Sequence, residues 1–156
     1  MSIAPAVLLV ELLMSADRLI TAAQQATFTV QPDEWPAATI LGHVSLVDTQ
    51  VWLPRIEMMT AADAGGGAIE PPVFTWWEPD ATVTQAHFAD YTVDEAGAAL
   101  LAGRTGILHR LRELPEGSWS AQAQHEVFGL IDVQGLLLQI LAHDEEHRSS
   151  LLIGSR

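Results

Sequence analysis

The sequence predicts an all-α fold, a four-helix bundle that occupies residues 1–156 as a single domain. Its 156 residues suit one hydrophobic core. Apolar residues recur at helical spacing over four long stretches, whereas the only short β-like runs are 27–30 and 72–77, both placed among proline and glycine. Four helices without a credible sheet bury their apolar stripes best by packing on one another.

The first predicted helix runs from about Pro5 to Ala26. Pro5 suits a helix start, where its missing N–H costs nothing. One apolar line along this helix consists of Leu8, Leu12, Leu19 and Ala23. This N-terminal stretch has no basic segment and is interrupted by Glu11, so we expect a buried or dimer-facing helix rather than a signal peptide or membrane span. The dimer-facing alternative predicts a homodimer.

The second predicted helix starts near Trp35 and runs to about Met59. Pro36 falls at an early helical position, and Pro54 should kink the helix or end its regular part. Its apolar stripe carries one polar member, in the order Ile40, His43, Val47 and Val51.

The third and fourth predicted helices run from about Thr82 to Leu114 and from about Asp132 to Leu152. Long crossover loops, 60–81 and 115–131, join the helices and allow a topology other than a simple up-and-down bundle. Within the second crossover, residues 119–131 are expected to be irregular or partly helical.

Charge and composition exclude several classes of function. The chain has 7 basic residues, none of them lysine, against 20 acidic ones, for a formal charge of −13. Such a surface repels phosphate backbones and anionic lipids, so neither a nucleic acid nor a membrane is an expected partner. The absence of cysteine excludes disulfides, thiolate metal sites and a cysteine nucleophile, and it is consistent with a cytoplasmic location.

The segment HDEEH at 143–147 carries the clearest chemical signal. Leu136, Ile140, His143 and His147 are spaced by four, three and four residues, which continues a core stripe of the last helix into two imidazoles. Two inward imidazoles one turn apart can chelate a metal ion. The alternative is that they are polar residues near a helix C-terminus, where a positive charge is favourable.

His43 adds a third imidazole on an apolar stripe. Three buried imidazoles that face one another need a shared proton or ion, and a metal would satisfy all of them and keep a coordination position open. Spacing alone leaves this interpretation and the structural one open. His87 and His109 are expected near the surface, and His125 is expected to hydrogen-bond loop backbone.

Other metal sites fit the sequence less well. HDEEH also matches the H-x-x-E-H pattern of inverted zinc peptidases, but their further carboxylate ligand lies well downstream and only nine residues follow His147. A di-iron site needs two Glu-x-x-His motifs, which the chain lacks. No feature favours a haem between His43 and His147.

The segments EWPAATILGHVSLVDTQVWLPRI and GLLLQILAHDEEHRSSL resemble the second and last helices of the DinB/YfiT-like metalloenzyme superfamily. Arg104 and the segment HEVFG at 125–129 also match positions of that family. The resemblance implies a four-helix bundle with a divalent metal, usually zinc or nickel, held by His43, His143 and His147. It also points to Asp48 as a further ligand or a supporting partner.

Family members with known activity include transferases that use low-molecular-weight thiols. The resemblance therefore implies a metal-dependent S-transferase acting on such a thiol and a small electrophile, with no catalytic residue assigned. A metal-dependent hydrolase and a non-catalytic metal-binding stress-response module are the alternatives. Trp76 and Trp77 are expected to line the mouth of the pocket or simply to pack. Asp144 and Glu146 are candidates to orient an imidazole or act as a base, although helical phase places both on the flanking and opposite faces.

Overall fold

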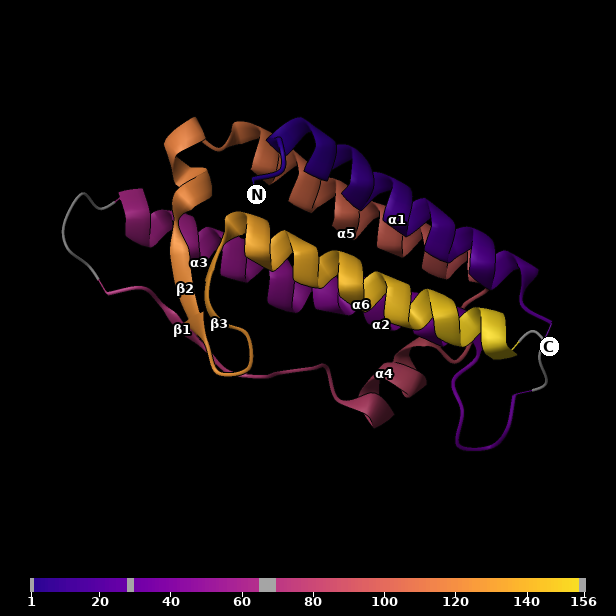
Figure 1. Cartoon of the computed structure of the whole chain (residues 1–156). Coiled ribbons are helices and arrows are strands. Elements are labelled where there is room, and N and C mark those ends of the chain that lie inside the picture. The colour runs from indigo at the N-terminus through magenta and orange to yellow at the C-terminus, as the bar shows by residue number, and fades with distance from the viewer. Residues whose placement is uncertain (1, 28–29, 65–69, 155–156) are drawn as a thin grey trace.

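The computed structural model describes residues 2–27, 30–64 and 70–154 and confirms the predicted helical bundle. Figure 1 shows long helices lying side by side, with a small sheet at one end and a short helix at the other. The helices are α1 (Pro5–Gln25), α2 (Ala37–Val47), α3 (Leu53–Ala64), α4 (Ala81–Phe88), α5 (Val93–Glu113) and α6 (Val133–Gly154). A 3-10 helix spans Glu116–Ser120.

The second predicted helix is continuous across Pro54, but it changes its hydrogen-bonding pattern just before it. A π-helical turn at Asp48–Trp52 joins α2 to α3, with the Leu53 N–H donating to the Asp48 carbonyl five residues earlier. The irregularity predicted at Pro54 therefore takes the form of a widened turn, and the helix then runs on to Ala64. Such π-turns are rare and are frequently found at functional sites.

The third predicted helix is wrong in one respect, because two helices occupy its range. α4 ends at Phe88, and α5 begins after Thr92, whose hydroxyl accepts from the Glu95 N–H while the Glu95 side chain accepts from the Thr92 N–H. This reciprocal capping box satisfies backbone donors at a new helix start and so favours a break there. Asp80 caps α4 in a similar way through the Val83 N–H.

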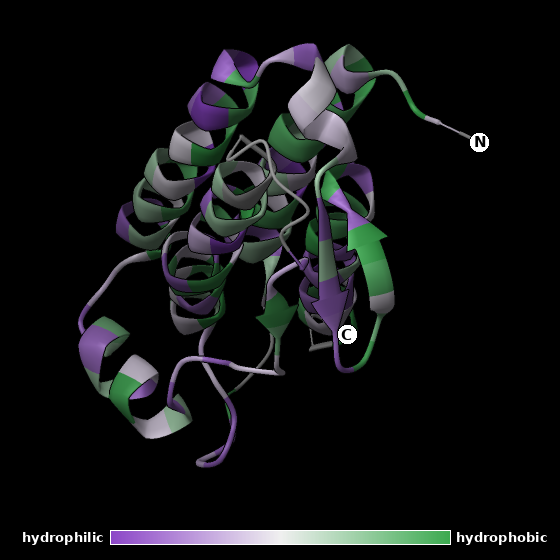
Figure 2. Ribbon diagram, turned by 90° about the vertical axis from the view of Figure 1, so that its left-hand side faces the viewer, coloured by the Kyte–Doolittle hydropathy of each residue, from purple (hydrophilic) through white to green (hydrophobic). Residues whose placement is uncertain are grey.

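A three-stranded sheet forms within the described residues, where the sequence predicted irregular structure. It consists of β1 (Val73–Phe74), β2 (Gln122–His125) and β3 (Gly129–Asp132) in the order β1-β2-β3. β1 pairs parallel to β2, and β3 pairs antiparallel to it. In Figure 2 the hydrophobic strands β1 and β3 flank the mostly hydrophilic β2 beside the bundle. β1 lies in the predicted run 72–77, whereas the run 27–30 lies partly outside the described residues and its remaining residues are not in a strand.

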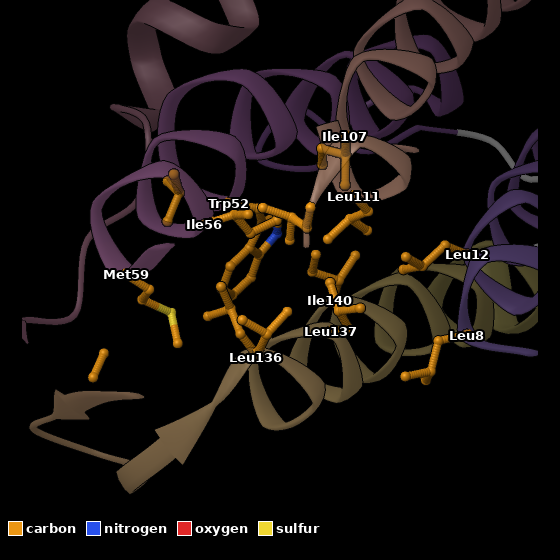
Figure 3. Packing of buried hydrophobic residues seen from close by; sticks show 14 of the residues in the cluster. Leu8, Leu12, Trp52, Ile56, Met59, Ile107, Leu111, Leu136, Leu137 and Ile140 are labelled. Carbon is orange, nitrogen blue, oxygen red and sulfur yellow. The ribbon is translucent and has the colours of Figure 1, made fainter. Parts of the chain in front are cut away.

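The core is divided into two apolar clusters along the bundle. The cluster near the sheet unites α1, α3, α5 and α6, and Figure 3 shows its side chains, among them Leu8, Ile56, Ile107, Leu136 and Ile140. The second cluster fills the other end, and its fully buried members include Leu19, Leu41, Leu100 and Leu151.

No helix in the described part of the chain is long and apolar enough to cross a membrane. The outward face of α1 exposes four apolar side chains, Val7, Val10, Leu13 and Met14. The homodimer expected from this helix stays a prediction, and these are the side chains that its contact would cover.

Candidate metal centre

Three histidines from two helices converge between α2 and α6. His43 comes from α2, and His143 and His147 come from α6, which lies against α2 (Figure 1). One nitrogen of each imidazole lies within 4.8 Å of one nitrogen of each of the others. The structure thus brings together the three residues that the sequence selects. Among the described residues they form the only cluster with metal-ligand spacing.

Burial keeps these imidazoles neutral. It lowers the pKa of His43 to about 4, with a further contribution from the charge of His147. It lowers the pKa of His143 to about 3, helped by His147, His43 and Arg104. The pKa of His147 is also lowered by burial, although the carboxylates of Glu146, Asp144 and Glu78 oppose the shift. At neutral pH all three therefore offer a free lone pair, the form that binds metals.

The geometry of the cluster fits a bound cation. His143 Nε2 and His147 Nε2 are 3.1 Å apart. Nitrogens that share a tetrahedral zinc ion at about 2.0–2.1 Å are separated by roughly 3.3 Å, close to this distance. The Nδ1 atoms of His43 and His143 are buried without a hydrogen-bond partner among the described residues. Three neutral imidazoles suit borderline divalent ions such as zinc or nickel.

A buried ionic network lies beside the histidines. Arg104 of α5 is completely buried; its Nε donates to Asp48 at 2.9 Å, and its two terminal nitrogens donate to Asp144 at 2.7 and 3.0 Å. It also donates to the Leu12 carbonyl, and the Ser15 hydroxyl donates to Asp144. The network therefore ties α1, α5, α6 and the π-turn together.

This network changes the roles expected for two carboxylates. Asp144 was predicted on a flanking or opposite face of α6 but is only 1% exposed, because Ser15 of α1 and Arg104 of α5 lie against its carboxylate. Asp48 does not join the histidine cluster and instead pairs with Arg104. Burial raises the pKa of Asp48 to about 6, and the charge and hydrogen bonds of Arg104 oppose that rise. Glu146 is exposed.

Two clefts border the histidine cluster, one at His147 and one at His143. The wide cleft has a volume of about 510 Å³, and it is lined by His147, Ser150, Asp33, Glu34, Trp35 and Ile40. The narrow cleft has a volume of about 30 Å³ and borders His143, Trp52, Arg55, His125 and Phe128. Trp76 and Trp77 also line the narrow cleft, with exposed fractions of 55% and 49%. Their predicted place at a pocket mouth matches this arrangement.

Sequence reasoning located the other histidines well but missed Arg55. His87 and His109 are exposed, and His125 Nδ1 accepts from the backbone N–H groups of Val127 and Phe128, as expected. Arg55 lines the narrow cleft beside His125. Its only sequence signal is that it is an isolated cation in the apolar run VWLPRI.

Fold and site together define a helical-bundle protein with a candidate three-histidine metal centre. The chain belongs to the DinB superfamily, whose family model matches residues 9–151. No curated protein matches the chain.

A similar solved structure is YfiT from Bacillus subtilis, described as a probable metal-dependent hydrolase with an unusual four-helix bundle topology. It aligns with 14% sequence identity and a TM-score of 0.72, over 99% of this chain and 89% of YfiT. At this identity the similarity establishes a shared fold.

Proposed function

We propose that this protein is a metal-dependent enzyme that activates an external nucleophile at His43, His143 and His147, and that the nucleophile is a low-molecular-weight thiol transferred to a small electrophile. The observation that carries the proposal is the convergence of three neutral imidazoles, one buried and two half-buried, beside two clefts. A divalent zinc or nickel ion bound there would lower the pKa of a thiol and favour the nucleophilic thiolate. Because the chain has no cysteine, the thiol has to come from a substrate.

The remaining residues supply position and access. Arg104 binds Asp144 of α6 and Asp48 of the π-turn. It therefore fixes the part of α6 that carries His143, and also the turn that follows His43 at the end of α2. Trp35 packs against His43, with ring centroids 5.2 Å apart, and it also lines the wide cleft. This cleft, at about 510 Å³, falls within the usual size of a small-molecule site.

Two features favour a transferase over a hydrolase. A transferase binds two substrates, and besides the wide cleft at His147 a second, much smaller cleft of about 30 Å³ borders His143. A hydrolase commonly places a general base near its water, and Asp144, which directly follows His143, is not free for that role because Arg104 and Ser15 hold it. Before it binds the metal, a thiol is already far more acidic than water, because its pKa is much closer to neutral.

Hydrolysis remains the second candidate, since the structurally similar YfiT is described as a probable metal-dependent hydrolase. A non-catalytic metal-binding module is the third. The proposal further includes a cytoplasmic location and no nucleic-acid or membrane partner, in agreement with the acidic, cysteine-free composition. It also includes a homodimer, which the exposed apolar side chains of α1 support.

The test combines elemental analysis with two activity assays on zinc- and nickel-loaded protein. One assay follows loss of free thiol in the presence of an aryl halide, and the other follows hydrolysis of a nitrophenyl ester without thiol. Thiol-dependent product supports the transferase, thiol-independent hydrolysis supports the hydrolase, and bound metal without either reaction supports the non-catalytic module. Full metal content in His143→Ala protein would contradict all three. His109→Ala, which alters an exposed histidine, is the matched control.

A further inference from the structure

Arg55 and His125 place two nitrogen atoms close together in the narrow cleft, and the hydrogen-bonding capacity of the two side chains does not account for this contact. Arg55 Nη1 and His125 Nε2 are 3.2 Å apart. The guanidinium carries only donors, so a hydrogen bond between these atoms requires His125 Nε2 to be an acceptor.

The other ring nitrogen of His125 excludes that role. Nδ1 accepts from the Val127 N–H at 3.0 Å and from the Phe128 N–H at 3.4 Å, so it carries a lone pair and no proton. The pKa of His125 is lowered by burial and by the charge of Arg55, which keeps the ring neutral. A neutral imidazole has one N–H, and here it has to be on Nε2. Two donors therefore face each other, and an atom that accepts from both would resolve the contact.

No carboxylate of the described residues supplies that acceptor. Arg55 makes no ion pair among them, although the chain has 20 acidic residues against 7 basic ones. The two acidic neighbours are engaged elsewhere, since Glu126 accepts from the Trp76 backbone N–H and Glu78 accepts from the Trp76 indole. Arg55 itself is held by the Thr75 carbonyl and by the Phe74 ring, 4.9 Å from its guanidinium carbon.

We propose that Arg55 and His125 form an anion subsite that binds the carboxylate of a small organic acid in the cleft next to His143. The planar fork of arginine matches a carboxylate, and the narrow cleft, with a volume of about 30 Å³, excludes a bulky group. The body of the ligand would lie against Trp76 and Trp77, which are half exposed beside the cleft. Trp77 also lines an adjoining groove of about 310 Å³ that contains Arg55, where a longer ligand would continue.

The role of this subsite in substrate selection rests on the proposed function, because that role requires a carboxylate on one of the two proposed substrates, the electrophile or the thiol. Carboxylate binding itself does not depend on it. Carboxylate binding at the subsite is distinguished from binding to the metal by comparing zinc-loaded protein with protein freed of metal by a chelator. A carboxylate that binds only to the metal would no longer bind after the metal is removed.

The experiment titrates wild-type protein with benzoate, benzamide and inorganic phosphate, followed by calorimetry and tryptophan fluorescence. We expect saturable benzoate binding with and without zinc, and weaker binding of benzamide and phosphate. Arg55→Met, which keeps the apolar stem, should weaken benzoate binding by about 10- to 100-fold, the usual contribution of charged hydrogen bonds. Arg55→Lys should show a smaller loss, and Arg148→Met, which removes a cation paired with Glu145, should show none.

Three results would overturn the proposal: no saturable binding of benzoate, equal binding of benzamide, or unchanged affinity in both Arg55 variants. Circular dichroism establishes that each variant is folded. If the metal-free protein does not fold, the zinc-loaded comparison of wild type with Arg55→Met and Arg55→Lys decides the question.

Discussion

Arg104 and Asp144 form a two-point ion pair in the middle of the bundle, with nitrogen–oxygen distances of 2.7 and 3.0 Å and both side chains almost completely buried. Asp144 directly follows the candidate ligand His143 on α6. The pair therefore fixes the rotation of α6 about its axis at the position where the imidazoles turn toward α2. A second carboxylate, Asp48 of the π-turn, shares the same guanidinium.

Removing Arg104 should be strongly destabilising. Arg104→Met leaves Asp48 and Asp144 buried without their cation, and breaking a buried ion pair in this way costs about 3–5 kcal/mol. We expect that loss in the free energy of unfolding measured with urea. The control is Arg148→Met, whose partner Glu145 is 59% exposed, and which should cost less than about 1 kcal/mol. Equal effects of the two substitutions would mean that the buried network does not stabilise the fold.

Metal loading should stabilise the protein through the three histidines. A ligand that binds only the folded state at about 100 times its Kd adds about 2.7 kcal/mol. For a chain of this length each kcal/mol corresponds to about 2–4 °C in Tm, so we expect an increase of roughly 5–10 °C with zinc or nickel, reversed by a chelator. The shift should disappear in His43→Ala, His143→Ala and His147→Ala, and persist in His109→Ala. A shift that survives all three substitutions would locate the metal elsewhere.

The metal-free protein should lose stability as the pH falls from 7 to 5. Above about pH 6.5 the three imidazoles are neutral in the folded and the unfolded chain. Below that value the unfolded chain takes up protons, whereas folded His43 and His143, with pKa values of about 4 and 3, do not. The unfolded state then binds more protons, so stability decreases toward acid pH. We expect a loss on the order of 2 kcal/mol.

Asp48 acts in the opposite direction over part of this range. Its pKa of about 6 means that the folded chain holds a proton between about pH 6 and 4 that the unfolded chain has released, which favours the fold. Because one carboxyl group opposes three imidazoles, the free energy of unfolding should still decrease toward pH 5 by the amount given above. Urea unfolding at pH 7 and pH 5 measures this net loss, and His143→Phe should reduce it. Stability that rises toward pH 5 would contradict the assigned pKa shifts.

The sequence predicted the features that depend on periodicity. The helical stripes located the bundle, and His43, His143 and His147 were identified because each occupies a position where the stripe requires a buried residue. Asp144 was misplaced by the same reasoning. A single stripe describes one covered face, but α6 packs against α1 as well as against α2 and α3, so a residue beside the stripe is buried too.

Features that depend on contacts between distant segments were not predictable from periodicity. The strands are short, and β1 pairs with β2 across about fifty residues. The role of Arg55 depends on His125 from that sheet, seventy residues further along the chain. The break before α5, by contrast, was readable, since Thr92 and Glu95 form the capping-box pattern in the printed sequence.

Two glycines offer a matched test of the packing near His43. A Cβ on Gly42, in α2, would lie 2.4 Å from the Phe88 ring of α4, whereas a Cβ on Gly106, in α5, would meet nothing within 4 Å. Alanine favours a helix over glycine by about 1 kcal/mol at either position. Gly106→Ala should therefore raise the free energy of unfolding by up to about 1 kcal/mol.

Gly42→Ala should instead lower the free energy of unfolding by about 1–3 kcal/mol, because overpacking exceeds the gain in helix propensity. Phe88 cannot move freely, because it is only 3% exposed and its ring centroid lies 4.8 Å from that of Tyr91. Displacing Phe88 would also move α4, whose first residue, Ala81, lines the wide cleft at His147. Gly42→Ala should therefore weaken zinc binding while Gly106→Ala does not. Urea unfolding and zinc titration of both variants measure this, and equal stability changes would show that Phe88 tolerates the added methyl group.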